Sequence, residues 1–122
     1  MADFKKIFLV DDNPVNLRAG KNVLCEAYEV FTAPSAARMF ELLRDVRPSL
    51  ILLDIEMPQM DGYEAIKLLK SNTETSTIPV IFLTGKTDPE YEKEGRVLGA
   101  ADYIKKPFDP GELCRRIEPY LT

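Results

Sequence analysis

The chain has 122 residues, of which 45% are hydrophobic and 30% are charged. This length and composition are typical of one folded domain, here residues 1–122, and they argue against a disordered chain. Sixteen Lys and Arg against 20 Asp and Glu give a net charge of −4, which argues against direct nucleic-acid binding because that activity needs a basic surface.

Two residue counts exclude whole classes of chemistry. The chain has no histidine, which excludes Ser-His-Asp catalysis, Cys-His catalysis, His-ligated zinc and a phosphohistidine donor. Its two cysteines, Cys25 and Cys114, form no CxxC pair and offer neither a disulfide scaffold nor a zinc site.

The apolar runs are too short for a membrane-spanning segment or a signal peptide. The longest are about four residues, far below the ~20 of a membrane span, and the run after Lys5-Lys6 is too short for a signal peptide. We therefore expect a cytoplasmic protein with no membrane partner.

Short apolar segments alternate with helical patterns along the whole chain. Continuous apolar runs suit strands that are buried on both faces of a parallel sheet. In chain order we expect a strand at 7–10, a helix from Asn13 to about Ala27, a weaker strand at 28–31, a helix after Ser35, a strand at 50–53, a helix at about 63–70, a strand at 80–83, a helix from Asp88, a weaker strand at 101–104 and a helix from Asp109.

Capping residues mark the starts of these helices. Asn13-Pro14 and Asp109-Pro110 each place a capping side chain before a proline at the first helical position. Ser35 caps the second helix, and Glu112, three residues after Asp109, makes a pair that resembles a capping box. The fourth helix is richly charged and contains Gly95, which lowers its local stability.

Strand and helix alternate five times, which predicts an α/β fold. We expect a single doubly wound parallel sheet with helices on both faces and right-handed crossovers. Ligands of such sheets bind at the carboxyl ends of the strands. The residues expected there are Asp11 and Asp12 after the first strand, Asp54 after the third, Thr84 after the fourth and Lys106 after the fifth.

Three carboxylates, a hydroxyl and an ammonium at one edge form a chemically coherent set. Adjacent carboxylates raise one another's pKa and need a counter-charge, and Mg²⁺ suits carboxylate and phosphoryl oxygens. A carboxylate beside such an ion can attack a phosphoryl group and form an aspartyl phosphate, while the ion and the lysine neutralise the transferred group. Each residue alone is more simply a turn former or a solvated charge. The prediction of a phosphoryl-transfer site therefore depends on their joint placement at the strand ends.

The chain resembles the receiver domains of two-component response regulators over essentially its whole length. The resemblance implies a flavodoxin-like fold of five strand–helix units with strand order 2-1-3-4-5. The segments that match are 9–13, 52–58, 60–62, 83–85 and 102–108.

The same resemblance implies a role for each site residue. Asp54 would accept the phosphoryl group, with catalytic help from Lys106 and Thr84. Of the metal-binding acids, Asp11 would reach Mg²⁺ through water. The metal-binding set that the resemblance implies is Asp11, Asp12, Asp54 and the backbone carbonyl of Glu56.

The resemblance also implies how phosphorylation becomes a signal. Thr84 would move to the new phosphoryl oxygens and Tyr103 would turn inward, shifting the population of two packings of the fourth helix, fifth strand and fifth helix. The peptide bond Lys106-Pro107 is expected to be cis. Glu56 and Lys86 carry opposite charges beside the site, and they either pair across its mouth and slow hydrolysis or remain two solvated side chains.

The expected partners are a histidine kinase or phosphotransfer protein as donor and a downstream effector whose identity is unknown. A second copy of the chain, in a homodimer, is a further candidate partner. The chain would not be an enzyme acting on a separate substrate, because it would catalyse only its own Mg²⁺-dependent phosphorylation and dephosphorylation. The alternative function is a receiver that binds proteins without being phosphorylated.

Two other functions of this fold class fit the sequence less well. A haloacid-dehalogenase-type phosphatase has its nucleophile after the first strand and a second acid two residues on, where this chain has Asn13 or Val15. A flavodoxin-like cofactor binder needs a loop that cradles phosphate, and Asp11-Asp12 would repel that ligand.

Overall fold

The computed structural model describes residues 4–85 and 89–121. Their strands form one parallel sheet in the order β2-β1-β3-β4-β5, as expected from the family resemblance. The bounds of the strands are β1 Lys6–Val10, β2 Glu29–Ala33, β3 Leu50–Asp54, β4 Val80–Thr84 and β5 Asp102–Lys105.

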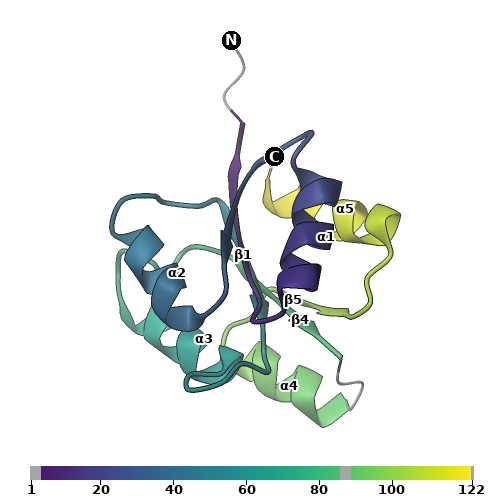
Figure 1. Cartoon of the computed structure of the whole chain (residues 1–122). Helices are drawn as coiled ribbons and strands as arrows, with labels where there is room; N and C mark the ends of the chain where they lie inside the picture. The colour runs from purple at the N-terminus through teal and green to yellow at the C-terminus, as the bar shows by residue number, and fades with distance from the viewer. Residues whose placement is uncertain (1–3, 86–88, 122) are drawn as a thin grey trace.

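Helices cover both faces of this sheet. Figure 1 shows α1 and α5 on one face and α2, α3 and α4 on the other, so the predicted doubly wound α/β fold is confirmed. The bounds of the helices are α1 Pro14–Leu24, α2 Ala36–Leu43, α3 Gly62–Ser71, α4 Pro89–Val97 and α5 Pro110–Ile117, followed by a 3-10 turn at Glu118–Tyr120.

Each central strand contributes side chains to two separate core layers. Along β1, Phe8 and Val10 face the layer under α2, α3 and α4, whereas Ile7 and Leu9 face the layer under α1 and α5. All five residues of β3 and of β4 are buried. Burial on both faces explains why these strands are continuous apolar runs rather than alternating patterns.

The predicted caps of α1, α2 and α5 are present. In each case a side-chain oxygen accepts a hydrogen bond from a backbone N–H of the first turn, which satisfies one of the free donors of the helix end. These bonds run from Val15 to Asn13 (2.9 Å), from Arg38 to Ser35 (3.1 Å) and from Glu112 to Asp109 (3.0 Å).

The structure differs from the sequence-based expectations in several local features. The first helix ends at Leu24 instead of about Ala27, and in the turn that follows the carbonyl of Leu24 accepts hydrogen bonds from the amides of Ala27 at 3.2 Å and of Tyr28 at 3.0 Å. A complete capping box that the sequence analysis did not single out starts α3, where Asp61 and Glu64 each accept a backbone N–H. The second and fifth strands each begin one residue later than expected, at Glu29 and Asp102.

Two further points concern the helices. The capping residue expected before the fourth helix, Asp88, lies outside the described residues. Within the part of the chain that the structure describes, no helix is long and apolar enough to cross a bilayer.

Candidate functional site

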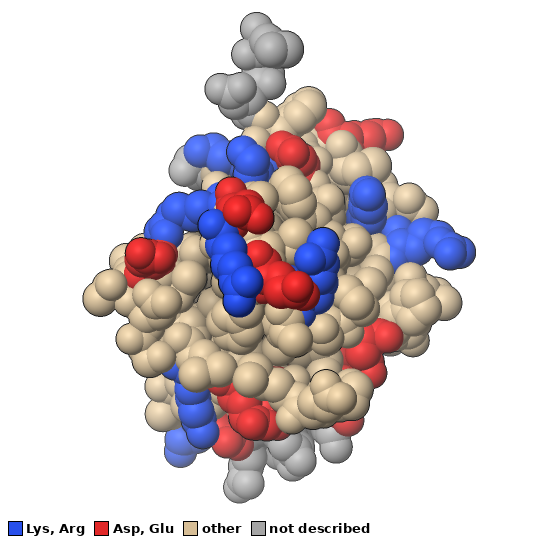
Figure 2. Space-filling view, turned by 60° about the vertical axis from the view of Figure 1, so that its left-hand side comes forward, with Lys and Arg blue, Asp and Glu red and all other residues tan. Residues whose placement is uncertain are grey.

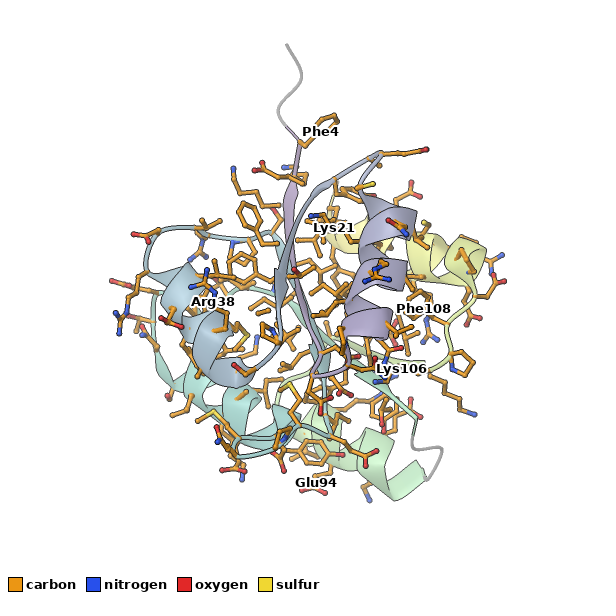
Figure 3. The ribbon with its side chains drawn as sticks, in the orientation of Figure 1. Phe4, Lys21, Arg38, Glu94, Lys106 and Phe108 are labelled. Atoms are coloured by element: carbon orange, nitrogen blue, oxygen red, sulfur yellow. The ribbon has the colours of Figure 1, made fainter. Side chains whose placement is uncertain are left out.

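The carboxyl ends of the parallel strands meet at one edge of the sheet. Asp11 directly follows β1, Asp54 is the last residue of β3, Thr84 is the last residue of β4, and Lys106 directly follows β5. The amide of Lys106 donates to the carbonyl of Thr84 at 2.7 Å. Figure 3 shows the Lys106 side chain at this edge, between the start of α1 and α4. The fold therefore brings together the predicted residues.

Lys106 bridges the two buried carboxylates of the site. Its Nζ lies 3.0 Å from Oδ2 of Asp11 and 3.1 Å from Oδ1 of Asp54. The acids are 1% and 2% exposed, so these are charge-assisted hydrogen bonds in a poorly solvated place. The neighbouring Lys105 is exposed, and the peptide bond between Lys106 and Pro107 is cis, as predicted.

Asp11 has further hydrogen bonds that hold it in place. Its Oδ1 accepts from the amide of Asn13 at 2.9 Å, and its Oδ2 accepts from the side-chain amide of Asn16 at 3.2 Å. Hydrogen bonds of this kind offset the desolvation of a buried charge. The sequence analysis missed the role of Asn16. The position of Asn16 in the first helical turn after the acidic pair could have indicated that its side chain reaches Asp11.

The negative charge of the three acids at the site exceeds the positive charge of Lys106 beside them. Carboxylate oxygens of Asp11, Asp12 and Asp54 lie within 4.8 Å of one another. Burial, and then the charge of Asp11, raises the pKa of Asp54 to about 6, although Lys106 opposes this. Burial lowers the pKa of Lys106, but its hydrogen bonds to Asp11 and Asp54 and the negative charges of these acids together outweigh burial and hold that pKa above its ordinary value. A cluster of three oxygen ligands with excess negative charge is compatible with Mg²⁺.

The loop after β3 is held against the site by a close backbone contact. A Cβ on Gly62 would lie 2.6 Å from the carbonyl oxygen of Asp54 and 2.8 Å from the Cα of Ile55. The amide of Gly62 donates to the carbonyl of Ile55 at 2.8 Å. Only glycine allows this approach, so α3 begins directly behind the carboxylate-bearing end of β3.

Comparison with known proteins identifies the family. Residues 7–118 match the model of the response regulator receiver domain. The chain belongs to the response regulator receiver domain family.

The relatives of this receiver domain include longer proteins. It is 44% identical over 115 residues to a probable cyclic di-GMP phosphodiesterase of Vibrio cholerae and 41% identical over 119 residues to the transcriptional regulatory protein CrdR of Helicobacter pylori. The matches cover 94% and 97% of the chain but only 26% and 55% of those relatives. The activities that those names state therefore belong to the relatives and are not assigned to this chain.

Solved structures share the fold over nearly the whole receiver domain. The chemotaxis protein CheY4 of Vibrio cholerae superimposes with a TM-score of 0.92 at 30% identity, covering 98% of this chain and 100% of that chain.

The two residues predicted to switch lie on neighbouring strands of this receiver domain. Thr84 is fully buried at the end of β4. Tyr103 of β5 is 6% exposed and belongs to the core layer under α2, α3 and α4. Its ring centroid lies 6.4 Å from that of Phe82. Tyr103 thus already has an inward position.

The residues predicted to tune hydrolysis are only partly described. Glu56 is exposed and lines a groove of about 650 Å³ with Asp12, Tyr63 and other residues of the β3–α3 loop and α4. Lys86 lies outside the described residues, so the pairing of Glu56 with Lys86 stays a prediction.

The charged surface of the receiver domain is mixed in sign. Figure 2 shows acidic and basic side chains interspersed on the face turned forward, without a continuous basic stripe. A mixed surface and a net charge of −4 give nucleic acid no basic footprint on that face.

Proposed function

We propose that Asp54 is the phosphoacceptor of this receiver domain and that the donor is a phosphohistidine on a histidine kinase or phosphotransfer protein. The observation that carries the proposal is the bridge from the Lys106 ammonium to Asp11 and Asp54 at the carboxyl edge of the sheet. A relative in Dictyostelium discoideum is named hybrid signal transduction histidine kinase D, which supports a kinase as the source of the phosphoryl group.

The phosphoryl transfer is an in-line substitution at phosphorus. With a pKa of about 6, Asp54 is about nine-tenths ionised at pH 7. One carboxylate oxygen attacks the phosphorus, a P–O bond forms, the P–N bond of phosphohistidine breaks, and its electron pair goes to the imidazole nitrogen. Lys106 orients the carboxylate and neutralises phosphoryl oxygens, and the Thr84 hydroxyl hydrogen-bonds the product.

Mg²⁺ is the proposed cofactor. Asp12, Asp54 and the backbone carbonyl of Glu56 would hold the ion directly and Asp11 would hold it through water, which fits the three hydrogen bonds that already engage the Asp11 carboxylate. When bound, Mg²⁺ supplies positive charge to the phosphoryl oxygens during the transfer.

The output is a change in the packing of α4, β5 and α5. Phosphorylation adds charge and acceptor oxygens beside Thr84, and Tyr103 couples that change to the surface. An effector protein then binds the altered face, or a second receiver does so in a homodimer. The chain catalyses only its own phosphorylation and dephosphorylation in the cytoplasm, and Glu56 with Lys86 slows the attack of water on the phosphoryl group.

Intact mass after incubation with acetyl phosphate tests the function. We expect one phosphoryl adduct that requires Mg²⁺ and is absent from Asp54→Asn. The control is Asp45→Asn, because Asp45 is an exposed acid after α2 and its loss should leave the adduct intact. An adduct retained by Asp54→Asn would contradict the assignment of the nucleophile. Absence of any adduct, also with a phosphorylated histidine donor protein, would favour the phosphorylation-independent receiver.

A further inference from the structure

Three aromatic rings from three different elements lie in contact in the core layer under α3 and α4. Phe82 of β4 is fully buried. Its ring centroid lies 5.5 Å from that of Tyr63 of α3, at an interplanar angle of 89°, and 6.4 Å from that of Tyr103 of β5, at 77°. Both are edge-to-face arrangements within the preferred range of separation, so Phe82 is the shared neighbour of the two tyrosines.

The two ends of this aromatic row open on different grooves. Tyr63 lines the groove at the phosphoacceptor edge together with Asp12 and Glu56. Tyr103 lines a groove of about 340 Å³ between α4, β5 and α5, together with Glu92 and Phe108. The row therefore spans from the mouth of the site to the surface that is proposed to bind the effector.

Helix α4 rests directly on the ring at the centre of the row. A Cβ on Gly95 would lie 2.9 Å from Cδ2 of Phe82 and 3.0 Å from its Cε2, and 3.8 Å from Cδ2 of Tyr103. Gly95 is buried although it lies in a charged helix. The position of α4 and the orientation of the Phe82 ring are thus mutually restricted, because protein cores are packed at crystal-like density.

We infer that Phe82 is a positioning residue that couples Tyr63, at the mouth of the phosphoacceptor site, to Tyr103 and α4 at the output face. This inference rests on the proposed phosphoacceptor function. A displacement of Tyr63 by a group bound at the site moves the Phe82 ring, and that ring lies against Tyr103 and the backbone at Gly95. Replacing the ring by a smaller apolar side chain removes both contacts and leaves the acids and Lys106 in place.

Fluorine NMR on the 3-fluorotyrosine-labelled chain tests this coupling. The chain has five tyrosines, and single Tyr→Phe variants assign the signals of Tyr63 and Tyr103. Beryllofluoride with Mg²⁺ mimics the phosphoryl group and reports its own binding by its fluorine signal. In the unmodified sequence we expect beryllofluoride to move both tyrosine signals. In Phe82→Leu it should still bind and move the Tyr63 signal, but the Tyr103 signal should lose most of its displacement.

Phe8→Leu is the matched control for the loss of a core ring. Phe8 is also fully buried and has a ring partner, Phe31, at 5.7 Å, but it lies on β1. Its variant should keep the full displacement of the Tyr103 signal. If Phe82→Leu binds beryllofluoride and keeps that displacement as well, the coupling role of Phe82 is wrong. If the unmodified sequence does not bind beryllofluoride, the proposed function itself fails.

Gly95→Ala tests the same contact without removing the ring. The added methyl group must displace the Phe82 ring or α4, so the Tyr103 signal should shift even without beryllofluoride. Gly85→Ala is the control, because a Cβ there meets no atom within 4 Å among the described residues outside its chain neighbours. An unshifted Tyr103 signal in Gly95→Ala would overturn the inference even if Phe82→Leu does not fold.

Discussion

The ammonium of Lys106 is shared by two carboxylates that are otherwise shielded from water. Removing it in Lys106→Met leaves Asp54 beside the charge of Asp11 and takes away the one cation paired with it among the described residues. A cation at this distance shifts a carboxyl pKa by about 1–3 units, so the pKa of Asp54 should rise by that amount above its value of about 6. A pH titration of the Asp54 carboxyl carbon by NMR in metal-free buffer measures the change.

Lys105→Met is the matched control for this substitution. It removes the same charge one residue earlier, from an exposed side chain, and should leave the titration of Asp54 unchanged. An equal effect of both variants would mean that Asp54 responds to net charge and not to its contact with Lys106.

The raised pKa of Asp54 also predicts a pH-dependent cost to stability. Asp54 ionises near pH 6 in the folded chain and at its ordinary value of 3.8 in the unfolded chain. The folded state therefore binds more protons between these values, and the free energy of unfolding contributed by Asp54 falls as the pH rises through this window. The difference of about 2 pKa units corresponds to roughly 3 kcal/mol.

Asp54→Asn removes this cost because an amide does not ionise. In metal-free buffer the variant should exceed the natural sequence in free energy of unfolding by up to about 3 kcal/mol at pH 7 and by little at about pH 4. Urea denaturation followed by circular dichroism suits a chain without tryptophan. A difference that stays constant with pH would contradict ionisation of Asp54 as its cause.

At the scale of elements, the junction of β3 with α3 depends on a backbone contact. In Gly62→Ala the methyl group meets the backbone of Asp54 and Ile55, which cannot rotate away as a side chain can. Overpacking typically costs about 1–3 kcal/mol, and we expect a loss of that size in urea denaturation. Because the displaced loop carries Glu56, the affinity for Mg²⁺ should fall as well.

Gly20→Ala separates the backbone contact from simple crowding. Its Cβ would lie 2.6 Å from Cδ2 of Leu9, the end of a flexible side chain that can change rotamer. We expect a smaller loss of stability than for Gly62→Ala and no change in Mg²⁺ affinity. Equal losses would mean that the nature of the neighbouring atoms does not matter.

At the scale of the whole molecule, the features that could be predicted were those marked by residues within one short segment of the sequence. The runs that became β1, β3 and β4 are apolar at every position, which indicated burial on both faces before the sheet was known. Asn13 and Ser35 showed their capping role by residue type alone. The convergence of Asp11, Asp54 and Lys106 followed from parallel strands, since their carboxyl ends must share one edge.

The features that could not be predicted depend on contacts between distant segments. Gly95 seemed only to weaken a helix, because the ring of Phe82 beneath it is 13 positions away in the sequence. The end of α1 at Leu24 depends on where the next strand pairs with β1. The order of the strands came from the family resemblance, since alternation of strand and helix does not determine it.

The whole fold should gain stability from Mg²⁺ because the acids that would bind it come from different strands. A ligand that binds only the folded state adds about 2.7 kcal/mol to the free energy of unfolding at 100 times its dissociation constant. Asp12→Asn should lose most of this gain without harming the apo fold, since Asp12 is exposed. Asp45→Asn removes an equal charge away from the site and should keep the gain. Urea denaturation with and without Mg²⁺ measures all three chains, and equal gains in the two variants would mean that Mg²⁺ acts by general screening instead of through this cluster.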